Sequence, residues 1–463
     1  MAEPSAAGAP CDVAVVGGGL AGITAALRLA DAGRQVTLVE SRPRLGGAAF
    51  SFPRTAAGVE LTVDNGQHVF LRCCTAYRAL LARLGVGDRV HLQRRLDIPV
   101  LHTDGRRGRL ARTPAVPAPL HLSRSLAGYR LLSVADRVRA ARGALALRSL
   151  DPDDRSLDSR TLGAFLGEHG QSPAVVDALW GIVATATLNL PPEQASLQLA
   201  AKVFRTGLLD HADAGDIGWA AAPLGHLHDA AARAALAAAG VRLLLGCAAR
   251  RIEPGTVTVA ARRGAAAPFT LPAPEVVLAV PHAAVDGLAG LVVEPLGSSA
   301  IVNVHVIYDR AVTDLPFAAS VGGTAQWVFD RTTSSGLAAA RPGWQYLAVT
   351  VSAADALLQV PSPQVQRAVV AELSALFPAA DRAEVLAAFV TRERHATFRQ
   401  APGSNTARPG PATGVPGVWL AGAWTATGWP DTMESAVRSG NAVADALLAR
   451  GADRIPVHEG APA

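Results

Sequence analysis

The sequence predicts an α/β protein in which a Rossmann-like parallel sheet holds a dinucleotide. Three features near the N-terminus lead to this prediction: a strand over residues 12–16, glycines at positions 17, 19 and 22, and a second strand over 35–39 that ends in Glu40. Runs of β-branched residues of this kind are typical of strands that are buried on both faces. The unit as a whole indicates nucleotide binding far better than the glycines alone.

Each glycine of the G-x-G-x-x-G pattern has a physical role. Gly17 permits a tight turn, Gly19 lets the backbone approach a pyrophosphate, and Gly22 lets the next helix pack on the strand. That helix is expected over 23–32, and the N–H groups at its start would hold the pyrophosphate. Glu40 lies where an acid accepts a hydrogen bond from a ribose hydroxyl.

Length and composition suggest several domains and a lipophilic ligand. A chain of 463 residues is too long for one core, and half of its residues are hydrophobic while 17% are charged. The net charge of +5 comes from arginine, because Lys202 is the sole lysine, and no basic run is interleaved with aromatic residues. We therefore expect no nucleic-acid partner.

Cysteine spacing and hydropathy restrict the remaining possibilities. The four cysteines have no metal-ligand spacing, so we expect no metal and reduced thiols in a cytoplasmic protein. Residues 1–10 lack the pattern of a signal peptide and are expected to be a disordered leader. No uncharged apolar stretch is long enough to span a bilayer, so any membrane contact would be peripheral, from the inner face.

Further along the chain, local patterns predict two kinds of element. Helical regions are expected over 74–84, 121–150, 158–206, 226–240 and 364–377. Strands are expected over 241–245, 276–281, 301–308, 327–330, 345–351 and 390–398, with hairpins over 96–112 and around Gly264. The strands after residue 297 would form a second, mixed sheet that carries the substrate cavity.

Two helical stretches have sequence features that bear on their role or their ends. The arginine-rich region over 121–150 is either a solvated face over an apolar core stripe or a surface that lies on anionic lipid. Residues 180–190 form an apolar helix that ends before Pro191-Pro192, and Glu193 is expected near the N-terminus of a new helix.

Residues 40–47 and 418–440 carry a family resemblance. Glu40, Arg42, Arg44, Gly46 and Gly47 resemble the E-x-R-x-R-x-G-G-R stretch of the flavin amine oxidase and phytoene desaturase superfamily. That resemblance implies FAD as the cofactor and a glutathione-reductase-type FAD-binding domain with a discontinuous substrate domain and a helical subdomain. The closing stretch, with Thr432-Met433-Glu434, resembles the superfamily's T-M-E segment, whose helix N-terminus suits a reduced, anionic flavin.

The chain departs from the superfamily pattern twice. Ala48 stands where the superfamily usually has arginine, and Ala423 replaces an acid that usually bonds the ribityl chain or phosphate. The segment 246–252 resembles the one that returns to the adenine, where the backbone near Ala249 makes contact. The predicted cofactor-binding residues are Gly17, Gly19, Leu20, Ala21, Gly22, Glu40, Arg42, Arg44, Gly46, Gly47, Ala48, Ala249, Gly422, Ala423, Thr432, Met433 and Glu434.

One subgroup resembles the chain in particular. Residues 65–68 (Asn-Gly-Gln-His), 189–196 and 424–428 are similar to stretches of the hydroxysqualene dehydroxylases. This resemblance implies a long isoprenoid substrate, whose allylic hydroxyl is replaced by hydrogen to give squalene for hopanoid synthesis. His68 and Gln67 are then the candidate catalytic donors, with local hydrogen bonding in a polar turn as the alternative reading. Asn189, Trp424 and Trp429 are candidate pocket residues, and core packing is the alternative for the tryptophans.

Other chemistries remain open at this stage. A phytoene-type carotenoid desaturase also binds long isoprenoids, and a non-catalytic flavoprotein subunit would tolerate both departures. Amine oxidases commonly place a lysine on the strand expected over 300–308, which has none here. The expected partners are the isoprenoid, an electron donor and synthases of the same pathway.

The resemblance also predicts the domain organisation. The FAD-binding domain would comprise 11–95, 222–296 and 412–450, the substrate-binding and helical domain would comprise 96–221 and 297–411, and 451–463 would form a flexible tail.

Overall fold

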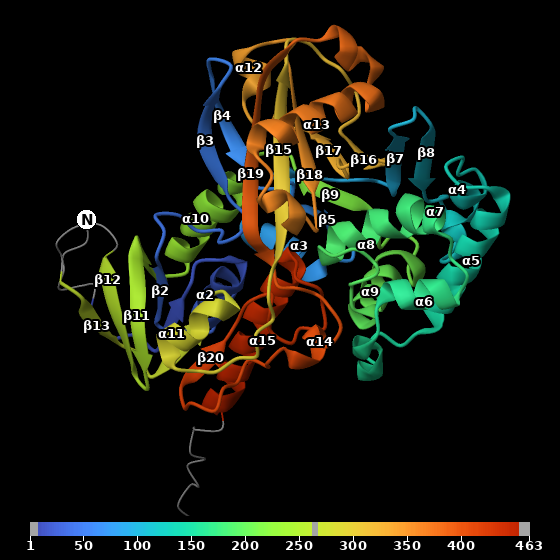
Figure 1. Ribbon diagram of the computed structural model, residues 1–463. Helices are drawn as coiled ribbons and strands as arrows, with labels where there is room; N and C mark the ends of the chain where they lie inside the picture. The colour runs from blue at the N-terminus through green and yellow to red at the C-terminus, as the bar shows by residue number, and fades with distance from the viewer. Residues whose placement is uncertain (1–7, 262–266, 453–463) are drawn as a thin grey trace, which may run out of the picture.

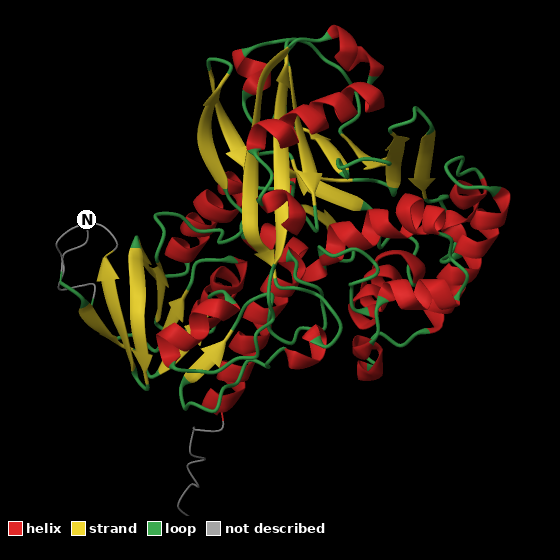
Figure 2. Ribbon diagram, in the orientation of Figure 1, coloured by secondary structure: helices red, strands yellow, loops and turns green. Residues whose placement is uncertain are grey.

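The computed structural model describes residues 8–261 and 267–452 (Figure 1). Most of the predicted leader, most of the predicted tail and the turn predicted at Gly264 lie outside the described residues. Three groups of elements are visible: a parallel sheet with its helices at the lower left, a large twisted sheet at the top, and a helical layer at the right (Figures 1 and 2).

The predicted parallel sheet is present. It has five strands in the order β10-β2-β1-β14-β20, and every neighbouring pair is parallel. Its strands are β1 (Val13–Val16), β2 (Val36–Glu40), β10 (Arg242–Leu245), β14 (Glu275–Leu278) and β20 (Val418–Leu420). These strands come from three distant parts of the chain, and β1 and β2 are buried along their whole length. Burial on both faces explains their nearly continuous apolar sequences.

Alternate residues of this sheet enter two different cores. Val15 and Val277 face a core formed with the helices α2 (Leu20–Asp31), α3 (Thr75–Arg83), α10 (Ala231–Ala238) and α15 (Met433–Ala452). Val16 and Leu278 face the opposite core, which is covered by a three-stranded antiparallel sheet. That sheet consists of β11 (Cys247–Glu253), β12 (Thr256–Ala261) and β13 (Phe269–Pro272).

The second sheet is mixed, as predicted, and has seven strands in the order β19-β15-β18-β17-β16-β7-β8. They are β7 (Asp97–His102), β8 (Arg107–Ala111), β15 (Ser299–Tyr308), β16 (Phe317–Val321), β17 (Trp327–Asp330), β18 (Gln345–Val351) and β19 (Val385–Thr397). The hairpin predicted over 96–112 forms its edge through a parallel pairing of β7 with β16. The sequence pattern missed β16, because Phe-Ala-Ala-Ser-Val has no clear alternation.

Smaller elements connect the two sheets. The hairpin of β3 (Ser51–Ala56) and β4 (Val59–Asp64) follows the nucleotide unit directly. A short sheet, β5-β9-β6, joins β5 (Val69–Leu71), β9 (Ile217–Ala220) and β6 (Val90–Leu92). Helix α13 (Ser362–Leu376) covers one face of the seven-stranded sheet with Val365, Val369 and Leu373.

The helical layer packs on the other face, against Phe317 and Phe329. Its helices are α4 (Ser123–Ala127), α5 (Val134–Ser149), α6 (Leu162–Glu168), α7 (Pro173–Val175), α8 (Gly181–Leu188) and α9 (Leu197–Phe204). Short helices elsewhere are α11 (Val285–Ala289), α12 (Leu337–Ala340) and α14 (Ser404–Ala407). Among the helices of the described chain, none combines the length and the apolar composition that crossing a bilayer requires.

One helix-start prediction is wrong. Glu193 lies in an exposed loop, and α9 begins at Leu197, where the hydroxyl of Ser196 accepts a hydrogen bond from the N–H of Leu199. A hydroxyl at the cap position satisfies this N–H directly, whereas Glu193 is four residues too early. Thr161 caps α6, accepting from the N–H of Ala164.

Candidate cofactor and substrate site

The glycine turn has the close packing that its sequence predicts. Gly17 has φ +111°, and a Cβ there would lie 2.2 Å from the carbonyl oxygen of Ala279. A Cβ on Gly22 would lie 1.9 Å from the carbonyl oxygen of Gly17. Both positions therefore require glycine because the helix, the turn and β14 are in contact there.

Gly19 is different, because it faces open space. A Cβ added there would meet nothing closer than the Cα of Gly47, at 3.7 Å. Gly19 caps α2 without a side chain, the first turn of the helix has no acidic residue, and Leu20, Ala21 and Gly22 are buried. Buried N–H groups at a helix start need an acceptor, and a pyrophosphate supplies one.

Glu40 is held in place by the backbone. Its two carboxylate oxygens accept hydrogen bonds from the N–H of Gly18 and the N–H of Arg42, each at 2.7 Å. These bonds fix the orientation of the carboxylate at the end of β2. Lone pairs remain on it, and the predicted bond to a ribose hydroxyl stays a prediction.

The guanidinium of Arg44 lies beside the two glycines of the next turn. Its Nη1 donates to the carbonyls of Leu45 and Gly47, and the group lies 3.5 Å from the centre of the Phe50 ring. Its Nη2 is buried without a hydrogen-bond partner among the described residues, and burial lowers the pKa of Arg44. Arg42 and Ala48, in contrast, are exposed. A buried guanidinium nitrogen without a partner can bind a phosphate oxygen, so Arg44 can supply the contact that Ala48 lacks.

Ala249 lies on β11 at an irregularity in the strand pairing, between Ala249 and Arg251. The chain enters this strand beside the nucleotide unit, since the N–H of Gly246 donates to the carbonyl of Arg42 at 3.0 Å. The returning segment therefore reaches the edge where the adenosine half of a dinucleotide is expected.

The closing loop after β20 is held by Arg408, a buried residue that no sequence pattern singles out. The guanidinium of Arg408 donates to the carbonyls of Ala423, Trp424 and Trp429. Burial lowers the pKa of Arg408 to about 10. The loop that contains Ala423 is thus fixed by hydrogen bonds to its backbone, although the acid usual at that position is missing.

The start of α15 presents backbone N–H groups, and its side chains are bound elsewhere. The hydroxyl of Thr432 accepts from the N–H of Ser435 at 3.3 Å, and Met433 is partly buried against the core. The buried carboxylate of Glu434 accepts from the N–H groups of Ala76 and Tyr77, so it caps α3. Any contact of Glu434 with the flavin is therefore limited to its main chain. Gly422 precedes this region with φ +145° and donates to the hydroxyl of Ser439.

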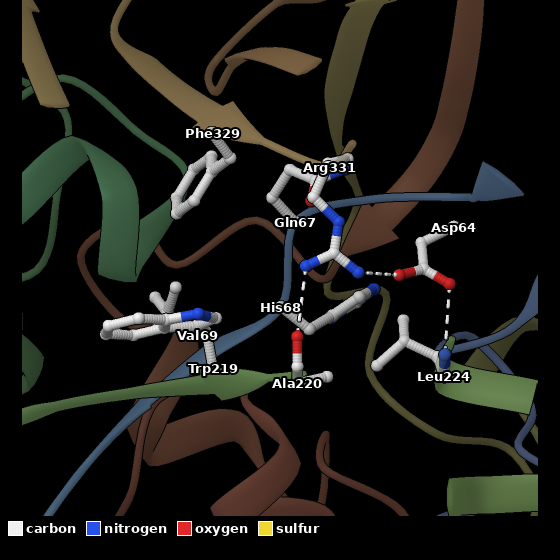
Figure 3. Close-up of a pocket in the computed structure, with 9 residues that line it drawn as sticks. All are labelled: Asp64, Gln67, His68, Val69, Trp219, Ala220, Leu224, Phe329 and Arg331. Carbon is white, nitrogen blue, oxygen red and sulfur yellow. Dashed lines mark hydrogen bonds and ion pairs between the residues drawn. The ribbon is translucent and has the colours of Figure 1, made fainter. Parts of the chain in front are cut away.

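The segment from Asp64 to His68 leads from the cofactor region into a pocket. The amide of Asn65 donates to the carbonyl of Ala48 and accepts from the N–H of Phe50, which joins the segment to the second glycine turn. The pocket has a cavity volume of about 10 Å³, room for about one water molecule. Its lining residues are Asp64, Gln67, His68, Val69, Trp219, Ala220, Leu224, Phe329 and Arg331 (Figure 3).

His68 and Arg331 are the polar groups at the centre of this pocket. The Nε2 atom of His68 is buried and has no hydrogen-bond partner in the described chain. Arg331 donates to a carboxylate oxygen of Asp64 at 2.6 Å and to the carbonyl of Ala220 at 3.1 Å (Figure 3). Burial and the positive charge of Arg331 lower the pKa of His68 to about 4, so the imidazole is neutral at pH 7.

The three predicted pocket residues lie outside this pocket. The amide of Asn189 donates to the carbonyl of Ser299 and accepts from the N–H of Ala353, which ties α8 to the seven-stranded sheet. Trp424 is buried and donates to the carbonyl of Val280. The ring of Trp429 packs against the guanidinium of Arg438, 4.6 Å from its centre. Their expected contacts with substrate remain predictions.

Sequence patterns missed Arg331, Trp219 and Phe329. Trp219 and Phe329 lie on strands far from the 65–68 segment, and Arg331 directly follows one of these strands. Nothing in the local sequence marks any of the three. Only the pairing of β9 with β5, and of β17 with its neighbours, brings them to His68.

Comparisons with known proteins identify the family of the chain. The sequence model for the flavin-containing amine oxidoreductases matches residues 20–448. The chain is 31% identical to the hydroxysqualene dehydroxylase of Rhodopseudomonas palustris, over 95% of this chain and 99% of that one. It is 29% identical to the hydroxysqualene dehydroxylase of Sinorhizobium fredii, over 95% and 99% of the two chains.

A solved structure gives the same fold. An oxidoreductase of Methanosarcina mazei superposes with a TM-score of 0.68 at 16% identity, over 94% of this chain and 99% of that one. With the buried, uncapped start of α2 and the unpartnered Nη2 of Arg44, these matches identify the cofactor as FAD. The chain belongs to the flavin-containing amine oxidoreductase family.

Proposed function

We propose that this FAD-dependent oxidoreductase acts on a long isoprenoid and converts hydroxysqualene to squalene. The observation that carries the proposal is the unpartnered, buried Nε2 of His68, in a pocket that also presents Trp219 and Phe329. An unpartnered polar atom beside aromatic faces suits a substrate that carries a hydroxyl on an apolar chain. The full-length similarity to hydroxysqualene dehydroxylases supports the same substrate.

The reaction replaces a C–O bond by a C–H bond. The oxygen leaves with the electron pair of the C–O bond and takes up a proton to become water, and the allylic carbon accepts a hydride. When bound in its reduced form, FAD supplies that hydride. The protein holds the substrate, orients the oxygen and excludes water.

His68 acts in this proposal as a neutral hydrogen-bond donor. With a pKa of about 4, its imidazolium form is rare at pH 7, so His68 orients the hydroxyl instead of protonating it. Arg331 places positive charge near the departing oxygen, and its ion pair with Asp64 keeps the local charge balanced. The aromatic faces of Trp219 and Phe329 can stabilise positive charge on the allylic carbon. Gln67 stays a second candidate donor on the same segment.

Amine oxidation fits this chain less well. Strand β15 has no lysine, and Lys202 lies on α9, 3.9 Å from the carboxylate of Asp153. A phytoene-type desaturase remains the alternative, because it would use the same cofactor and a similar substrate.

One experiment separates the two activities. The purified protein, loaded with FAD and reduced without oxygen, is incubated with hydroxysqualene, and products are analysed by gas chromatography with mass spectrometry. We expect squalene to form while the flavin absorbance near its oxidised maximum returns. Absence of squalene, together with a lengthened polyene when oxidised enzyme is given phytoene and an electron acceptor, would favour the desaturase.

We further propose that the protein works in the cytoplasm, receives its substrate from synthases of the same pathway and contacts a membrane from one side. Isoprenoid hydrocarbons partition into bilayers, so an enzyme at the lipid surface has direct access to such a substrate.

A further inference from the structure

Helix α5 has apolar side chains on two opposite faces. Ala140 and Leu147 are buried in the core of the helical layer. Val134, Val138 and Leu145 are 73%, 48% and 58% exposed. Their spacings of four and seven residues place these three in one stripe that faces away from the core. Figure 1 shows α5 at the outer edge of the helical layer.

This stripe is the main exposed apolar feature of the part of the chain that the structure describes. The large apolar side chains exposed there are Val69, Leu120, Val134, Val138, Leu145, Val292 and Val385, and four of these seven fall between residues 120 and 145. Leu120 is 61% exposed and starts the short turn that leads into α4. Clustering of this kind marks an interaction surface, whereas single exposed residues do not.

Arginines without protein partners surround the stripe. Arg142 and Arg148 lie on α5 within one turn of Leu145, on its two sides, and Arg124 and Arg130 lie on α4 and the following turn. None of these four side chains has a hydrogen bond or ion pair within the described residues. The acid on α5, Asp136, is occupied by Ser133, Ser172 and Arg139.

The inner side of α5 is connected to the substrate pocket through a single apolar core. The cluster that contains Ala140 and Leu147 also contains Phe329, and Trp219 packs against it. Phe329 and Trp219 line the pocket beside His68. The stripe therefore lies on the outer side of the same layer of side chains that an isoprenoid would reach from within.

We propose that the outer face of α5, formed by Val134, Val138 and Leu145 with Arg142 and Arg148, docks on an anionic lipid surface. Apolar residues flanked by arginine insert below lipid headgroups while the guanidinium groups bind the headgroup phosphates. This inference rests on the proposed function for the nature of the substrate. A protein partner would be expected to place carboxylates opposite the arginines and to form a stable complex.

The test uses the FAD-loaded protein and sedimentation with vesicles, without substrate. We expect binding to vesicles of phosphatidylcholine with phosphatidylglycerol, and much weaker binding to phosphatidylcholine alone. The variant V138D/L145D should lose about tenfold or more in affinity. The variant R142Q/R148Q should lose roughly twenty-five-fold in affinity on the anionic vesicles only, since each arginine contributes about fivefold. V292D, at a 91% exposed valine outside α5, is the matched control and should bind like wild type.

Several results would overturn the inference. Equal binding by V138D/L145D and wild type, or no binding of wild type to anionic vesicles, would exclude this face as a lipid surface. Self-association of wild type that V138D/L145D abolishes would assign the stripe to a second copy of the chain. Turnover of detergent-dispersed hydroxysqualene is measured in parallel and should be unchanged in V138D/L145D. Absence of turnover in wild type with normal vesicle binding would contradict the proposed function and leave the docking face intact.

Discussion

Arg331 and Asp64 form a buried ion pair, with the guanidinium 2.6 Å from the carboxylate, and both line the pocket that holds His68. The other oxygen of Asp64 accepts from the N–H of Leu224 and the hydroxyl of Ser51. The pair thus joins three strands of different sheets, β4, β9 and β17, around one polar centre.

The first prediction concerns this pair. Arg331→Met should lower the free energy of unfolding by about 3–5 kcal/mol, because it leaves the Asp64 carboxylate buried and unpaired. Arg331→Lys should be milder since it keeps the charge. Urea denaturation monitored by circular dichroism measures both. Arg310→Met is the matched control, because Arg310 pairs with Asp309 at the surface, where solvent screens the pair and its loss should change stability little. Equal losses of unfolding free energy in R331M and R310M would contradict a structural role for the buried pair.

The second prediction separates catalysis from folding at His68. His68→Phe fills the same space without a polar atom, and we expect hydroxysqualene turnover to fall by about 10²- to 10³-fold because one hydrogen-bond donor is lost. FAD content, read from the flavin absorbance, and the unfolding midpoint should stay close to wild type. Gln67→Leu is the companion variant on the same segment. If His68→Phe kept wild-type turnover, the residue that orients the hydroxyl would be Gln67 or Arg331 and not His68.

The third prediction distinguishes two glycines of one motif. Gly19→Ala should fold normally, since its backbone is extended, with φ −75° and ψ 177°, and a Cβ there has room. The added methyl group would nevertheless occupy the space expected for the pyrophosphate, so FAD affinity should fall at least about tenfold. Gly22→Ala is the contrasting variant, because its Cβ would overlap the carbonyl of Gly17 and the whole unit would be destabilised. Flavin fluorescence titration measures FAD affinity, and thermal unfolding measures stability. Wild-type FAD affinity in Gly19→Ala would show that the pyrophosphate does not lie beside Gly19.

A fourth prediction tests how Ala48 is compensated. Arg44→Met should weaken FAD binding by about tenfold or more, because the buried Nη2 loses its proposed phosphate partner. Arg42→Met changes an exposed arginine two residues away and should have a smaller effect. Comparable losses of FAD affinity in both variants would indicate a general effect of positive charge instead of a specific contact with Arg44.

Local sequence was sufficient where the structural signal is local. The strands of the parallel sheet were predicted because burial on both faces leaves an apolar run, and the glycine turn because its packing tolerates no Cβ at Gly17 or Gly22. The roles of Arg331 and Arg408 could not be predicted, because their hydrogen-bond partners lie far away in the chain. Local sequence does not distinguish a buried arginine from an exposed one. Asn189 shows the opposite case: its motif is distinctive, yet its amide serves to tie α8 to the seven-stranded sheet.

The hydrogen bonds of His228 lead to a prediction about acid stability. This fully buried ring lies between the hydroxyl of Tyr77, 2.8 Å from Nε2, and the carbonyl of Ala49, 3.1 Å from Nδ1. The arrangement suits a neutral imidazole that donates through Nδ1 and accepts through Nε2. Burial lowers the pKa of His228 to about 4.

The unfolded chain, in which histidine titrates near about 6.5, therefore binds more protons than the folded protein between about pH 6.5 and pH 4. Lowering the pH through this window should reduce the free energy of unfolding, by up to ~3 kcal/mol from His228 at about 1.4 kcal/mol per pKa unit. His228→Gln should make the unfolding midpoint less dependent on pH there, while His211→Gln, at an exposed position, should keep the wild-type slope. An unchanged slope in His228→Gln would mean that this imidazole is already protonated in the folded protein, with the carbonyl of Ala49 and the oxygen of Tyr77 both accepting from it.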